Sequence, residues 1–180
     1  AYDPDSTLVD LPDIEKINLV EPNIFNCFKK RKSHRQYSSE FITLEELSYL
    51  LWCTQGIKEI RHDTYRSYRP VPSGGGRHPF ETYLIVNRVQ GLTPGVYRYL
   101  PVEHKLLFMF PEDNFQKRVT ELCLGQAFTG KSAVVFLWSC IPYRSEWKYF
   151  NNVHKLMLIE IGHVCQNLYL ACESLACKTC

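Results

Sequence analysis

Two arginines and a serine alternate in residues 31–35, whose sequence is RKSHR. In an extended segment alternate side chains point to the same side, so Arg31, Ser33 and Arg35 would converge on one ligand. Two forked guanidinium groups and a hydroxyl group suit a phosphate, because charge-assisted hydrogen bonds are strong. The alternative is a solvated basic helix end, where cationic side chains interact favourably with the helix dipole. The residues by themselves favour this second interpretation.

A glycine-rich segment, PSGGGRHPF at residues 72–80, leads into an apolar stretch. It lacks the Lys-Ser/Thr pair of a Walker motif, and its glycines precede a strand instead of opening a helix, unlike a dinucleotide-binding fingerprint. Glycines in such a place expose bare backbone, against which a flat ring can lie and form hydrogen bonds. A flexible surface loop is the alternative, but Pro72 and Pro79 stiffen the segment. We therefore expect a wall for a flat ligand.

Lys148 and Tyr149 are the candidate acid–base pair, within the sequence SEWKYF just before a long apolar segment. Lysine and tyrosine can transfer protons when burial or a neighbouring cofactor shifts their pKa values. A surface lysine beside a packing tyrosine is the simpler interpretation, and the residues alone favour it. The choice between the two depends on what lies next to the pair.

The long apolar segment itself contains polar residues in the stretch EIGHVCQNLYLA. Buried polar groups must be paired, and hydrogen bonds at an interface explain Glu160, His163, Gln166 and Asn167 as well as catalysis does. A single histidine without a second ligand at metal-binding spacing does not indicate a metal site.

Eight cysteines raise the question of disulfides or metal. Most lie in apolar, regular-looking segments, where a free cysteine behaves as a small hydrophobic residue, so we expect reduced thiols. Cys172, Cys177 and Cys180 have the C-x4-C-x2-C spacing of plant-type iron–sulfur proteins, but no further cysteine follows to complete a site. We expect no metal.

The bulk composition limits the class of protein. Of the 180 residues, 45% are hydrophobic and 22% charged, which is typical of one globular domain with a sizeable core. A net charge of +2 is too small to indicate nucleic-acid binding. No apolar stretch is long enough to span a membrane, and the acidic N-terminus is unlike a signal peptide, so we expect a cytoplasmic protein without membrane contact.

Hydrophobic periodicity gives the elements that must position these residues. Thr43 and Glu46 form a capping box before leucines at helical spacing, and Gly56 is placed to end that helix. Residues 1–22 show no periodicity and are expected to form an arm, and residues 58–76 a long loop. Helices are expected at residues 24–32, 43–56, 113–124 and 153–175, and strands at residues 81–87, 95–100, 105–110 and 133–140, the last fully buried.

The segment 153–175 is apolar nearly all round. A helix without a polar face must be central in the fold or lie in a subunit interface. Because strands and helices alternate irregularly, the class is α+β, with helices packed against an antiparallel-rich sheet.

The order of the motifs resembles the FMN-dependent nitroreductase-like family and, within it, the SagB-type dehydrogenases. The resemblance covers about residues 24–175 and rests on RKSHR, PSGGGRHP, GVYRYL, the Lys-Tyr pair and GHVCQNLYLA, in that order. It implies a nitroreductase-like FMN-binding domain over residues 23–180 after an arm at residues 1–22. It also implies a homodimer with two FMN molecules at its interface, where the long helix lies.

The resemblance also implies roles for the motif residues. Arg31, Ser33 and Arg35 would hold the FMN phosphate and ribityl chain. Lys148 would act as base on a ring carbon while hydride passes to flavin N5, with Tyr149 assisting, as in the branch that oxidises thiazoline and oxazoline rings of peptides. The isoalloxazine ring, mainly that of the other subunit's flavin, would be lined by Pro72, Ser73, Gly74, Gly76 and His78.

Two functional alternatives stay open on this resemblance. The first is an oxidoreductase acting on a small molecule or a peptide, with NADH or NADPH as a further candidate hydride donor. The second is a non-catalytic partner or scaffold in a modification complex. The family normally continues with a glycine-rich turn, whereas SLACKTC has Ala176 and Lys178 where glycines are usual, so a truncated C-terminal end is expected.

Overall fold

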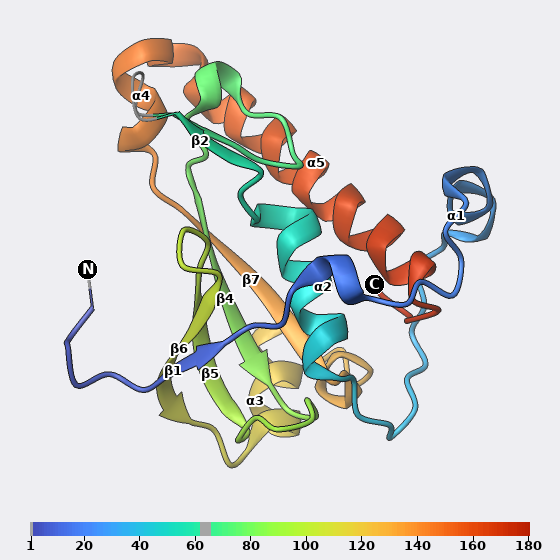
Figure 1. The fold of residues 1–180 in the computed structure, drawn as a ribbon. Coiled ribbons are helices and arrows are strands. Elements are labelled where there is room, and N and C mark those ends of the chain that lie inside the picture. The colour runs from blue at the N-terminus through green and yellow to red at the C-terminus, as the bar shows by residue number, and fades with distance from the viewer. Residues whose placement is uncertain (1, 62–65) are drawn as a thin grey trace.

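The computed structural model describes residues 2–61 and 66–180. Its centre is an antiparallel sheet of five strands in the order β1-β6-β5-β4-β7, flanked by helices (Figure 1). The strands of this sheet are β1 (Leu8–Asp10), β4 (Phe80–Val86), β5 (Gly95–Leu100), β6 (Lys105–Pro111) and β7 (Val134–Cys140). The α-helices are α1 (Ile24–Lys30), α2 (Leu44–Gln55), α3 (Phe115–Leu122), α4 (Tyr143–Tyr149) and α5 (Val153–Ser174). The predicted α+β class, with helices packed against an antiparallel sheet, is confirmed.

The start and end of α2 follow the sequence signals. Thr43 Oγ1 accepts a hydrogen bond from the Glu46 amide at 3.1 Å, and Glu46 Oε2 accepts one from the Thr43 amide at 2.7 Å. This reciprocal capping box satisfies two amide groups at the helix start. Gly56 caps the other end through its amide, which donates to the Trp52 carbonyl.

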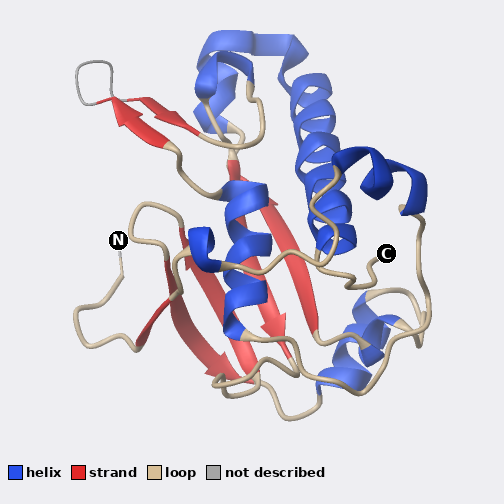
Figure 2. Cartoon of the chain, turned by 45° about the vertical axis from the view of Figure 1, so that its right-hand side comes forward, coloured by secondary structure: helices blue, strands red, loops and turns tan. Residues whose placement is uncertain are grey.

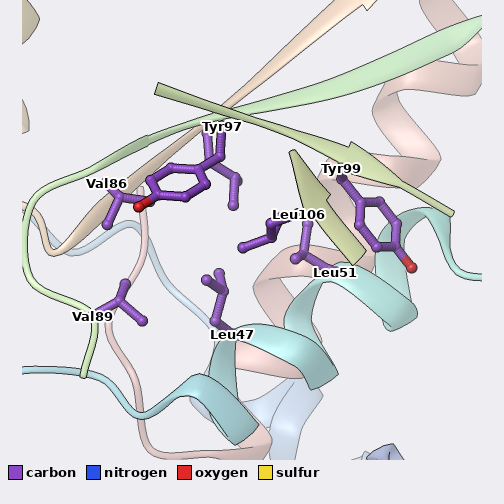
Figure 3. Packing of buried hydrophobic residues seen from close by; sticks show 8 residues of the cluster. Leu47, Leu51, Val86, Val89, Tyr97, Tyr99 and Leu106 are labelled. Carbon is purple, nitrogen blue, oxygen red and sulfur yellow. The ribbon is translucent and has the colours of Figure 1, made fainter. Parts of the chain in front are cut away.

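The main core lies between α2 and one face of the sheet (Figure 2). Leu47 and Leu51 of α2 are fully buried against side chains of β4, β5 and β6 (Figure 3). On β4, Leu84 and Val86 face this core, whereas Ile85 points to the opposite face and packs on α3. That alternation is the period of two of a strand, and it lets one strand serve two cores.

Helix α5 packs along α2 through Leu168, Ala171 and Cys172, which meet Leu50. It is not buried all round, because Leu158 and Ile159 are 73% and 59% exposed. Its polar residues divide accordingly. Glu160 and Asn167 are paired inside the chain, whereas His163 and Gln166 are exposed.

Three segments differ from the expectation. Residues 58–76 contain a short hairpin of β2 (Glu59–Arg61) and β3 (Arg66–Tyr68), although 62–65 lie outside the described residues. These strands are polar and mostly exposed, so they carry no apolar alternation to detect. The arm contributes β1, which pairs with β6. Strand β7 pairs with β4 at the sheet edge and leaves Leu137 42% exposed, so it is not fully buried as expected.

The helices of the described ranges include none long and apolar enough to cross a bilayer. All eight cysteines, each within those ranges, have free thiols. No group of three or more metal-binding side chains occurs among the described residues.

Candidate functional site

The glycine-rich loop is held by a buried carboxylate on α5. Glu160, only 4% exposed, accepts hydrogen bonds from Ser73 Oγ at 2.9 Å and from the Gly74 amide at 2.8 Å. Ser73 Oγ in turn accepts the His78 amide at 2.9 Å. Hydrogen bonds to a charged group are stronger than neutral ones, so this network fixes both ends of the loop against α5.

The middle of the loop needs glycine for two reasons. Gly75 and Gly76 have φ of +62° and +65°, in the left-handed region that L side chains rarely adopt. A Cβ atom on Gly75 would also lie 2.8 Å from Lys148 Nζ and 2.9 Å from Tyr149 Oη. At Gly76 a Cβ would meet nothing within 4 Å. The loop backbone and the candidate acid–base pair are therefore in direct contact at Gly75.

Two of the loop amides are already used inside the protein. The Gly74 amide donates to Glu160, and the Gly76 amide donates to the Ser73 carbonyl at 2.9 Å. Neither is available to a ligand in this conformation, which corrects the expectation that the bare backbone would offer these donors.

Helix α4 places Lys148 and Tyr149 next to the loop. Lys148 is exposed and Tyr149 half-buried, and the lysine Nζ lies 5.6 Å from the tyrosine ring centroid. The helix follows β7 directly, and the Ile141 amide donates to the Pro79 carbonyl at 2.8 Å. The loop and α4 are therefore anchored to each other at the end of the sheet.

His78 lies away from this contact. Its side chain is buried, with 7% exposed, and its backbone has φ of +45°. Burial, and then the positive charge of Arg69, lower the pKa of His78 to about 4, so the imidazole is neutral at pH 7. Pro72 is exposed at the start of the loop. Of the predicted loop residues, Gly76 and His78 line a neighbouring cavity that contains several arginines.

The RKSHR segment lies along the C-terminal half of α5. Arg31 is the C-cap of α1, and its guanidinium carbon lies 5.5 Å from the centre of the Tyr169 ring. Ser33 Oγ is 3.3 Å from the hydroxyl oxygen of the same tyrosine. The helix-end interpretation thus describes Arg31, whereas Ser33 lies beyond the helix in a segment without regular structure.

Arg35 continues this surface toward a second aromatic ring. Its guanidinium carbon lies 5.9 Å from the centre of Phe128, and Phe128 and Tyr169 both line a cavity of about 560 Å³. Arg31, Ser33 and Arg35 do not themselves line this cavity, but each lies against an aromatic residue that does. Sequence reasoning missed Tyr169 and Phe128, since nothing local marks a contact between residues so far apart in the chain.

The two candidate regions lie on different halves of α5. Glu160 contacts the glycine-rich loop and Tyr169 contacts the RKSHR segment. Nine residues separate them, which corresponds to roughly 14 Å along a helix. Within one chain, the structure does not bring the arginines to Lys148 and Tyr149.

Comparison with known proteins identifies the family of this chain. The sequence model of the Nitroreductase family matches residues 28–180, which include both candidate regions. The chain belongs to the nitroreductase family. Membership in this family supports an oxidoreductase function, and its members generally bind FMN.

Individual nitroreductase relatives cover the chain to different extents. A protein of Methanocaldococcus jannaschii named as a nitroreductase is 33% identical over 97% of this chain and 83% of its own length. The trifolitoxin-processing protein TfxB of Rhizobium leguminosarum bv. trifolii is 30% identical over 59% of this chain, and the match spans 30% of TfxB. A crystal structure from Anabaena variabilis, titled as a nitroreductase, has a TM-score of 0.77 and 26% identity over 96% of this chain, which spans 35% of that chain.

Proposed function

We propose that this nitroreductase-family protein is an FMN-dependent oxidoreductase that transfers hydride through flavin N5, with Lys148 and Tyr149 as its catalytic residues. The observation that carries the proposal is the contact at Gly75. There the Lys148 ammonium group and the Tyr149 hydroxyl group approach the loop so closely that a methyl group would collide with both. Lys148 and Tyr149 thus lie against backbone that carries no side chain. A flat ligand at this place would have two proton-carrying groups at its edge.

The residues present fit FMN in its two chemically different parts. Arg31 and Arg35 carry two positive charges on an accessible segment, and Ser33 adds a hydroxyl donor, which suits a phosphate and ribityl chain. The left-handed glycines Gly75 and Gly76 keep the loop free of side chains, which suits an aromatic ring. When bound, FMN would supply the two-electron chemistry, and the protein would supply position and proton transfer.

In this proposal each catalytic residue acts at a stated atom. Lys148 Nζ would be the base that removes a proton from a ring carbon of the substrate, and bound FMN would supply the hydride acceptor. Tyr149 Oη lies beside the same loop atom and donates a hydrogen bond that orients the substrate. Glu160 binds the start of the loop to α5, so this rigid helix sets the distance between the loop and α4.

A homodimer would unite the two halves of the site. The exposed apolar side chains of Leu158 and Ile159 lie on α5 next to Glu160, which holds the glycine-rich loop. Packing α5 against its copy in an antiparallel arrangement would bury them and bring the loop of one subunit near the arginines of the other. In this arrangement Ser73, Gly74 and Gly76 line the ring of a flavin whose phosphate the partner subunit holds.

We propose a SagB-type substrate, an azoline ring in a modified peptide, as the first choice. The similarity to a toxin-processing protein supports a peptide over a nitroaromatic compound. A small-molecule acceptor with NADH or NADPH as donor is the competing oxidoreductase reaction.

The test is reconstitution of the purified protein with FMN. We expect flavin absorbance near 450 nm at about one FMN per chain, loss of FMN retention in Arg35→Ala, and loss of azoline oxidation in Lys148→Ala with FMN still bound. Arg118→Ala, at an exposed arginine of α3, is the control for charge. A protein that remains colourless with excess FMN would refute the proposal, and one that binds FMN without turnover of any of these substrates would be a non-catalytic partner.

A further inference from the structure

Beside the glycine-rich loop, lined by Gly76 but not by Gly75, lies a second cavity of about 610 Å³. Four arginines line it, from four different elements: Arg69 after β3, Arg77 in the loop, Arg98 on β5 and Arg144 on α4. The lining residues that the structure describes include only two carboxylates, Glu81 and Glu103. The cavity therefore has an excess of positive charge, although the whole chain is nearly neutral.

One carboxylate accounts for two of the arginines. Glu81, on β4, accepts hydrogen bonds from Arg98 Nη2 at 2.7 Å and from Arg144 Nη2. Burial by itself would raise the pKa of Glu81. The hydrogen bonds and positive charges of Arg98 and Arg144 outweigh this effect, so the pKa of Glu81 is lowered. Glu81 therefore stays ionised and fixes Arg98 and Arg144 in place.

The other two arginines have no carboxylate within ion-pair distance among the described residues. Arg69 donates to the Gln55 amide oxygen at 2.8 Å, and its Nε atom is buried without a partner. Arg77 stacks on Trp147, with its guanidinium carbon 4.5 Å from the ring centroid, and its Nε is likewise buried and unpaired. A half-buried charge without a counter-charge is costly, and a bound anion would remove that cost.

We propose that this cavity is an oxyanion-binding subsite that takes a carboxylate or phosphate group, with Arg69 and Arg77 as the ligand-binding residues. Arg98 and Arg144, already held by Glu81, would shape the cavity and add positive potential. Each guanidinium group is a planar fork of N–H donors, and this geometry suits a carboxylate or a phosphate better than a lysine ammonium group would. The His78 imidazole, neutral at pH 7, adds no charge of its own.

The position of the cavity gives it a role in substrate choice. Helix α4 contributes Arg144 and Trp147 to the cavity and Lys148 and Tyr149 to the contact at Gly75. The loop similarly contributes Arg77 on one side and Gly75 on the other. A substrate whose anionic group binds in the cavity would therefore have its remaining part near the candidate catalytic pair. This role rests on the proposed function, whereas anion binding itself does not.

The experiment uses Trp147 as the reporter, because its ring lies against Arg77. The apo-protein is titrated with inorganic pyrophosphate and, separately, with succinate, following tryptophan emission and heat of binding. We expect saturable binding of at least one probe. Arg69→Gln and Arg77→Gln are each expected to weaken it about tenfold, the effect of losing a charge-assisted hydrogen bond. Trp147→Phe is expected to remove the emission change and keep the heat.

Matched controls separate this subsite from the RKSHR segment. Arg118→Gln removes one charge far from the cavity, and Arg35→Ala removes one from the RKSHR segment, so both are expected to keep the Trp147-reported binding.

Binding of pyrophosphate alone identifies a phosphate ligand, and binding of succinate a carboxylate ligand. Either supports the subsite. Unchanged affinity in the folded double variant Arg69→Gln/Arg77→Gln, equal weakening by Arg118→Gln, or no saturable binding of either probe overturns it. Thermal melting of each variant confirms folding.

Discussion

The Gly74 amide donates a hydrogen bond of 2.8 Å to Glu160, across 86 residues of sequence. The same carboxylate accepts the Ser73 hydroxyl, so one buried side chain of α5 fixes the start of the loop that meets Lys148 and Tyr149. The candidate catalytic surface is thus positioned by a buried residue outside the Lys148–Tyr149 pair.

Removing the Glu160 carboxylate is expected to release the loop. Glu160→Ala should lower the free energy of unfolding by about 2–4 kcal/mol, because two charge-assisted hydrogen bonds are lost and their partly buried donors lose their acceptor. Glu160→Gln should cost less, because the amide oxygen still accepts one donor. Urea unfolding measures both. Glu121→Ala, at an exposed helical ion pair with Lys117, is the control and should change stability by less than about 0.5 kcal/mol. Equal effects of Glu160→Ala and Glu121→Ala would contradict the role given to Glu160.

The two left-handed glycines give a matched pair of variants. Gly75→Ala and Gly76→Ala both put a Cβ atom at positive φ, which costs about 1 kcal/mol of backbone strain in each. Only the first collides with Lys148 and Tyr149. We expect similar small losses of melting temperature in the two variants. Because only Gly75→Ala displaces Lys148 and Tyr149, its kcat/KM should be at least tenfold lower than that of Gly76→Ala, roughly 1.4 kcal/mol of transition-state stabilisation. Equal activity in the two variants would show that the contact at Gly75 does not matter for turnover.

Acid should destabilise the protein through His78. The pKa of this imidazole falls to about 4 in the folded state because burial, and then Arg69, oppose its charge. Between pH about 6.5, the ordinary pKa of histidine, and pH about 4, the unfolded chain therefore binds more protons at His78 than the folded chain does. Stability is expected to fall as the pH drops through this window. In His78→Asn, whose side chain tolerates positive φ, the pH dependence should flatten, whereas the exposed His154→Asn should keep it. Urea unfolding at pH 7, 5.5 and 4.5 compares the three proteins.

The dimer arrangement predicts a change of oligomeric state on α5. Ile159→Asp places a charge among apolar side chains that the second copy would cover. The variant should therefore sediment as a monomer, and its secondary structure should stay unchanged. Leu124→Asp alters a side chain that is 92% exposed after α3 and should leave the mass unchanged. A wild-type protein that is monomeric at all concentrations would refute the arrangement.

Local chemistry in the sequence determined much of the fold. Thr43, Glu46 and Gly56 mark the ends of α2 because capping depends on neighbours within four residues. The strand β4 and the hairpin of β5 and β6 follow from apolar runs and turns in the same way. By contrast, β7 looked fully buried because an apolar run does not reveal whether a strand has one neighbour or two.

The candidate site divides in the same way between sequence and tertiary structure. Residue types alone identified Arg31, Ser33, Arg35, the glycines and the Lys148–Tyr149 pair as capable of chemistry. Only the tertiary structure decided that Gly75 touches that pair, that Glu160 occupies two loop donors, and that four arginines from four elements line one cavity. These relationships join residues far apart in the chain, and packing, not local preference, determines such contacts.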